Sequence, residues 1–101
     1  MLLYNTTYHV EQDCADRFMT WFKTNYIPAV IEEGLLTNPR LYKMLSHQEE
    51  GGQNICVQWD VEDSGVLHRW YTTQGIKLNE ELVKMFEDKV IGFPTLLEVL
   101  E

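Results

Sequence analysis

Basic side chains are scarce in this sequence of 101 residues. Eight Lys and Arg residues stand against 16 Asp and Glu residues, so the formal net charge is −8. Binding to nucleic acid depends on positive side chains that displace counterions from phosphates, and attraction to anionic lipids depends on them as well. We therefore expect neither nucleic acid nor a membrane surface as a partner.

Cysteine is equally sparse, and the spacing of metal ligands is missing. Cys14 and Cys56 lie far apart in the chain, and the three histidines form no HxxxH or HxH pattern. A redox or metal pair needs closer spacing than this. We expect no metal and no cofactor, and we expect both cysteines to behave as small buried hydrophobic residues.

The sequence also lacks a targeting segment, a linker, a repeat and a low-complexity region. Residues 1–10 carry no basic region and alternate polar with apolar side chains, which is typical of neither a signal peptide nor a membrane span. A chain of this length buries one core. We expect a cytoplasmic protein with a single domain over residues 1–101.

Hydrophobic periodicity divides the chain into six elements. Alternation predicts strands, and apolar residues at steps of three and four predict helices. The expected strands are 2–10, 40–47, 53–61 and 90–100, and the expected helices are 13–33 and 63–88. This β-α-β-β-α-β order predicts an α+β, ferredoxin-like fold with an antiparallel sheet that is covered by helices on one face.

Local signals mark the helix ends. Pro28 predicts a bend or a restart near Ile27, and Gly34 is suited to a left-handed helix end. Asp63 or Ser64 can cap the second helical stretch, which Gly75 is expected to interrupt.

The face of the sheet without helices is also expected to be apolar. Whichever residues of the second and fourth strands point away from the helices, the alternation leaves large apolar side chains there. The second strand offers Tyr42 with Met44 or Leu41 with Leu45, and the fourth offers Leu96 with Leu100 or Leu97 with Val99. An exposed patch of this kind needs a second layer. A second copy of the chain is the simplest cover, so we predict a homodimer.

Several segments together resemble one known family. They are Tyr4-Asn5-Thr6-Thr7, Trp21-Phe22-Lys23, Ile27-Pro28-Ala29-Val30, Gly34-Leu35-Leu36-Thr37, Val57-Gln58-Trp59 and Phe93-Pro94-Thr95-Leu96-Leu97-Glu98-Val99. The combination resembles an uncharacterised bacterial family of short proteins, a domain of unknown function (family 4286) related to the dimeric α/β-barrel superfamily. The resemblance implies a ferredoxin-like protomer whose sheet packs on that of its twin to form a dimeric α/β barrel. It implies no established reaction.

Two positions differ from the pattern of that family. A histidine commonly precedes the Ile-Pro pair in the family, and another opens a segment after the second helix. Tyr26 and Gln74 hold these places here. Either the chain lacks a proton-transfer role that its relatives have, or the positions are structural, and we favour the structural interpretation.

Aromatic side chains are the strongest candidates for a ligand site. Large aromatic residues can line a cleft between helices and sheet, where stacking and a few polar groups hold a flat apolar molecule. The candidate residues are Tyr4, His9, Trp21, Tyr26, Trp59 and Trp70, with Tyr4 and His9 as the polar groups. The alternative is that these side chains only fill the core and the dimer interface.

A second hypothesis pairs His9 with Asp60. It assumes that the third strand runs parallel beside the first, so that the two side chains meet at one edge of the sheet. An imidazole placed by a carboxylate can act as a general base near neutral pH.

Two functions follow from these observations. The first is a homodimer without catalytic activity that binds a small apolar or aromatic molecule in a cleft between helices and sheet. The alternative is an enzyme, because superfamily relatives include cofactor-independent monooxygenases and haem-degrading enzymes. Likeness of fold alone is a weak argument for an activity.

Overall fold

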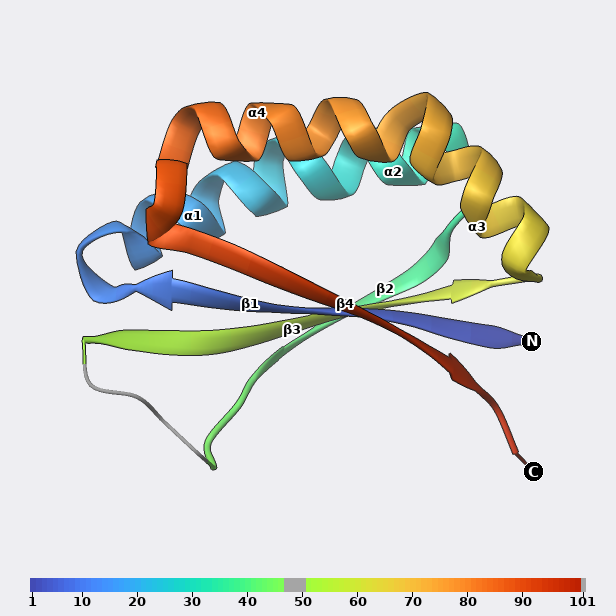
Figure 1. Cartoon of the computed structure of the whole chain (residues 1–101), viewed down its shortest axis with the longest axis horizontal. Coiled ribbons are helices and arrows are strands. Elements are labelled where there is room, and N and C mark those ends of the chain that lie inside the picture. The colour runs from blue at the N-terminus through green and yellow to red at the C-terminus, as the bar shows by residue number, and fades with distance from the viewer. Residues whose placement is uncertain (47–50, 101) are drawn as a thin grey trace.

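The computed structural model describes residues 1–46 and 51–100. Within these ranges the strands and α-helices are β1 (Leu2–Glu11), α1 (Ala15–Trp21), α2 (Ile27–Glu33), β2 (Thr37–Lys43), β3 (Gly52–Val61), α3 (Ser64–Trp70), α4 (Ile76–Phe86) and β4 (Val90–Glu98). The strands form one antiparallel sheet in the order β2-β3-β1-β4. All four helices lie on one face of this sheet, and the other face is open (Figure 1). The predicted α+β, ferredoxin-like fold is confirmed.

Each long helical stretch contains a π-helical turn in its middle. Phe22–Tyr26 joins α1 to α2, and Tyr71–Gly75 joins α3 to α4. The predicted restart at Ile27 is confirmed, and Pro28 lies in the first turn of α2, where its missing N–H costs little. At Gly75 the helix continues through a π-turn, so the expected interruption was wrong.

The predicted helix ends are confirmed at two places. Gly34 adopts a left-handed conformation with φ 80°, and its N–H donates to the carbonyl of Val30 at 3.2 Å. Asp63 caps α3, because its side chain accepts a hydrogen bond from the N–H of Val66 at 2.9 Å.

Strand β2 begins earlier than predicted. The Asn38-Pro39 pair was expected to be a turn before the strand, but the pairing of β2 with β3 shifts between Thr37 and Arg40, which is a bulge within β2. Asn38 has φ 54° there, and Pro39 needs no ladder hydrogen bond in a bulge. The expected end of this strand at His47 lies outside the described residues.

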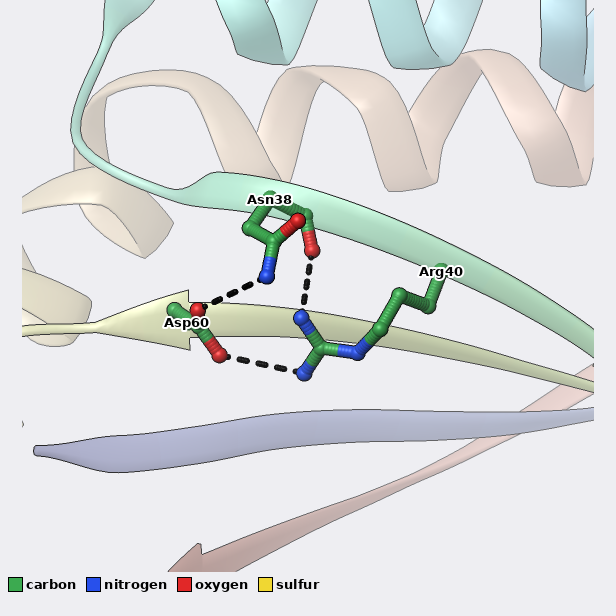
Figure 2. Close-up of polar contacts among 3 residues, drawn as sticks. All are labelled: Asn38, Arg40 and Asp60. Atoms are coloured by element: carbon green, nitrogen blue, oxygen red, sulfur yellow. Dashed lines mark hydrogen bonds and ion pairs between the residues drawn. The ribbon is translucent and has the colours of Figure 1, made fainter.

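A polar network fastens this bulge to β3. Asp60 accepts hydrogen bonds from the Asn38 amide at 3.1 Å and from the Arg40 guanidinium at 3.0 Å, and Arg40 also donates to the Asn38 carbonyl at 2.8 Å (Figure 2). The Asn38 amide and the Arg40 guanidinium hold the pKa of Asp60 below its usual value. The network therefore gives Asp60 a structural role.

The hypothesis that His9 meets Asp60 was wrong. Strands β1 and β3 are antiparallel, and Leu3 is the residue opposite Asp60. His9 lies opposite Asn54 near the other end of the pair, with 3.0 Å between its Nδ1 and the Asn54 Oδ1. The error came from treating two neighbouring strands as parallel, although the predicted antiparallel sheet already makes them antiparallel.

The core lies between the helices and the sheet. Its fully buried side chains include Phe18, Phe22, Trp70, Phe86 and Val57.

Cys14 is buried and Cys56 is half-buried, and both are free thiols. Within the described residues, no helix has the length and apolar character needed to cross a membrane.

Candidate functional site

A cavity of about 160 Å³ lies between the sheet and the helices, beside the two π-turns. Strands β1 and β4 form its floor, and Tyr26 and the Trp70–Asn79 region form its walls. The lining residues are Tyr4, Thr6, Tyr8, Tyr26, Trp70, Tyr71, Gly75, Asn79, Gly92 and Pro94. An apolar cavity of about 150 Å³ holds a benzene molecule, so this space accommodates a single aromatic ring.

Two glycines allow aromatic rings to form the cavity walls. A Cβ atom on Gly75 would lie 2.8 Å from the Trp70 ring, and one on Gly92 would lie 2.9 Å from the Tyr8 ring. Both distances are shorter than a carbon–carbon contact permits. The rings of Trp70 and Tyr8 can therefore lie directly against backbone, which leaves the space in front of them open.

A glutamine side chain holds Trp70 in place. The indole N–H of Trp70 donates to Gln74 Oε1 at 2.7 Å, and Gln74 Nε2 donates to the carbonyl of Ala29 at 2.9 Å. Gln74 thus links the second π-turn to α2. This bridge gives position 74 a structural role, whereas Tyr26, the other position that differs from the family pattern, lines the cavity.

Three phenol groups of the cavity are protonated near neutral pH. Burial raises the pKa of Tyr8 well above its usual value, and it also raises the pKa of Tyr26 and of Tyr4. The hydroxyls of Tyr8 and Tyr26 interact with each other, which raises the pKa of Tyr8 further. At pH 7 these three groups are therefore neutral phenols, each with one O–H that can donate a hydrogen bond.

We expect the free energy of unfolding to fall as the pH rises above about 10. Above the ordinary tyrosine pKa, Tyr8 and Tyr26 lose protons in the unfolded chain but keep them in the folded one. Their stabilising contribution is complete below pH 10 and decreases above it, by about 1.4 kcal/mol per pH unit for each group that stays protonated. Urea titrations between pH 8 and 11.5 measure this slope.

Tyr8→Phe and Tyr26→Phe should each flatten the alkaline slope. Tyr42→Phe is the matched control, because Tyr42 is half exposed on the opposite face of the sheet. A slope that neither cavity variant changes would contradict the protonation states given above.

The structure brings together three of the six predicted site residues. Tyr4, Tyr26 and Trp70 line the cavity. Trp59 and Trp21 do not line it, because Trp59 is buried elsewhere in the core and Trp21 packs edge-on against Phe86, with 5.9 Å between the ring centroids. His9 lies on the open face of the sheet, away from the cavity.

Sequence reasoning missed Tyr8 and Tyr71 as lining residues. Tyr8 has the same strand parity as Tyr4, so alternation alone places both on one face of β1. That signal was available for Tyr8. For Tyr71 there was none, because its position over the cavity depends on the π-turn that begins with it.

A larger hollow lies elsewhere. It measures about 570 Å³ and is open, between the first residue, the α2–β2 turn and the end of β3. Of its acidic residues, Asp60 is held by Arg40 and Asp63 caps α3. The smaller aromatic cavity has the better arrangement for a ligand, because aromatic faces and O–H donors converge on it.

Solved structures with a similar fold are known. A structure named antibiotic biosynthesis monooxygenase matches with a TM-score of 0.72 at 14% identity, over 100% of both chains. HapK from Hahella chejuensis matches with a TM-score of 0.74 at 14% identity, over 99% of this chain and 93% of that one. A dimeric ferredoxin-like protein from an uncultured marine organism matches with a TM-score of 0.67 at 11% identity, over 99% and 96%. At these identities the likeness concerns the fold.

No curated protein sequence matches the chain significantly. Residues 1–100 match the family described as Domain of unknown function (DUF4286). This match spans nearly the whole sequence, and it agrees with the resemblance found in the segments of the chain. The protein belongs to the DUF4286 family.

Proposed function

We propose that the protein binds a small aromatic molecule of one ring in the cavity between β1, β4 and the π-turns. The observation that carries this proposal is a cavity of about 160 Å³ with five aromatic side chains in its lining. Aromatic faces favour stacking or edge-on contact with a ring. The protonated hydroxyls of Tyr8 and Tyr26 supply hydrogen bonds to an oxygen on that ring.

Phenol is the probe that tests this site. A ligand that binds only the folded state at ten times its dissociation constant adds about 1.4 kcal/mol of stability. For a domain of this size that corresponds to a rise of about 6–11 °C in the melting temperature. Thermal melting and isothermal calorimetry with phenol measure the shift and the affinity.

Two variants test whether phenol binds in this cavity. Gly92→Ala should abolish it, since the added Cβ would push the Tyr8 ring into the open space. Tyr26→Phe should weaken phenol about 2- to 13-fold, the value of one hydrogen bond. Tyr42→Phe removes a hydroxyl from the other side of the sheet and should change nothing. Equal phenol binding by wild type and Gly92→Ala would refute the site.

We also propose that the chain is a homodimer in which two open sheet faces pack together. Ile91, Phe93 and Leu97 point to that face from β4, and they are 46%, 61% and 43% exposed. Four strands of this length form a sheet face of about 600 Å² when the face is treated as flat. The side chains that project from it add to this area, so it comes near the roughly 800 Å² that each partner buries in a stable interface.

The alternative function is an enzyme of the cofactor-independent monooxygenase kind. The observation that favours it is the full-length likeness to a structure named antibiotic biosynthesis monooxygenase. A haem-degrading enzyme is less compatible with this site, because a cavity for one ring is too small for a macrocycle of four. Oxygen-electrode measurements with hydroquinone test the alternative. An enzyme would be established if the wild type takes up oxygen faster than the spontaneous rate and if Gly92→Ala abolishes this additional uptake.

A further inference from the structure

A shallow groove lies next to the aromatic cavity. The groove measures about 360 Å³ and is lined by Tyr4, Ser64, Leu67, His68, Tyr71 and Pro94. Three of these residues, Tyr4, Tyr71 and Pro94, also line the cavity. The two spaces are therefore neighbours that share these three side chains.

The pairing of β1 with β4 gives the order of the lining residues along the cavity and the groove. Tyr8 lies opposite Gly92, Thr6 opposite Pro94, and Tyr4 opposite Leu96. Tyr8, Gly92 and Tyr26 line the cavity but not the groove, whereas Tyr4 and Pro94 line both, so the first three lie on the side of the cavity away from the groove. The phenol rings of Tyr8 and Tyr26 therefore lie at the end of the combined site that we call its inner end.

The groove has a different chemical character. Leu67, Pro94 and the rings of Tyr4 and Tyr71 make its surface mostly apolar. Strand β4 contributes Pro94 to it, from a stretch of this edge strand that is exposed. The groove therefore suits a flexible hydrocarbon chain better than a second polar group.

We propose that the ligand is a para-substituted phenol or aryl ketone with an apolar arm. Its oxygen lies at the inner end, within reach of Tyr8 and Tyr26, its ring fills the cavity, and its arm lies in the groove along Leu67 and Pro94. This inference rests on the proposed function, since it concerns the same site. It adds the orientation of the ligand and the class of its substituent.

A series of 4-alkylphenols from phenol to 4-butylphenol tests the arm. Complete burial of a methylene group raises affinity about fourfold, and burial in a half-open groove raises it about twofold. We therefore expect the affinity measured by calorimetry to rise about 16-fold from phenol to 4-butylphenol. Butylbenzene, which lacks the oxygen, should bind at least several-fold more weakly than 4-butylphenol.

A variant in the groove distinguishes the contribution of the arm to the affinity from the contribution of the ring. Leu67→Ala removes apolar surface from the groove and should reduce the gain from the butyl chain while the affinity for phenol stays the same. Val83→Ala, on the exposed side of α4, is the matched control and should leave the whole series unchanged.

The outcomes separate this inference from the proposed function. If phenol binds but the affinity does not rise along the 4-alkylphenol series, the proposed position of the apolar arm is wrong, and the proposed site for one ring is still supported. A gain that Leu67→Ala does not reduce overturns the assignment to the groove. Butylbenzene that binds as well as 4-butylphenol overturns the orientation. No binding of any member overturns the proposed site, and the inference with it.

Discussion

We expect Phe18→Ala to lower the free energy of unfolding by about 3–5 kcal/mol, the usual cost of removing a buried phenyl ring. Phe18 is fully buried, and its ring centroid lies 5.4 Å from that of Tyr8, 5.3 Å from Phe22 and 5.7 Å from Phe86. The variant loses the transfer energy of the ring and these contacts, and it leaves a cavity that the rigid sheet cannot close.

Such a loss is a large part of the total stability of a small domain, which is about 5–15 kcal/mol. Urea titration followed by circular dichroism measures it. Phe18→Leu keeps most of the volume and should cost less than about 1.5 kcal/mol. Val83→Ala should stay within about 0.5 kcal/mol, because Val83 is half exposed. Equal effects of Phe18→Ala and Val83→Ala would contradict the described core.

The second large effect concerns the dimer. We expect Phe93→Asp to convert the protein from two chains to one at micromolar concentration. Phe93 is the most exposed of the apolar side chains on the open face within β4. A symmetric interface buries the substitution twice, and each buried carboxylate without a partner costs several kcal/mol. Light scattering after size exclusion measures the mass directly.

Two controls make this result specific. Phe93→Leu keeps an apolar side chain and should remain dimeric. Val83→Asp introduces the same charge on the outer side of the helices and should also remain dimeric. A wild-type protein with the mass of one chain would refute the dimer, and a dimeric Phe93→Asp variant would show that the interface lies on another surface.

Local patterns were sufficient for most of the fold. The alternation in residues 2–10 and 53–61 places Tyr8, Val57 and Trp59 on the buried face, because successive strand residues point to opposite sides. The end signal at Gly34 and the cap at Asp63 depend on backbone geometry within a few residues. Such features are readable from sequence because they need no distant partner.

Features that depend on two distant segments were not predictable in this way. The bulge at Asn38 becomes part of β2 only through the pairing with β3 and the bonds to Asp60. Each π-turn adds one residue to a helix, and the apolar steps of three and four on either side of it were taken as one regular helix. The positions of Tyr26 and Tyr71 depend on these turns.

The sequence by itself determined the fold class, the helix ends and the surplus of apolar side chains on the sheet. These properties follow from short-range steric rules and from the removal of apolar surface from water. Only the tertiary structure decided which aromatic rings fill the core and which surround a cavity. Trp59 and Trp70 are both 2% exposed, but only Trp70 lies beside a space that Gly75 and Gly92 leave open. At Gly92 the space depends on the ring of Tyr8 lying against the backbone of another strand, which no local pattern encodes.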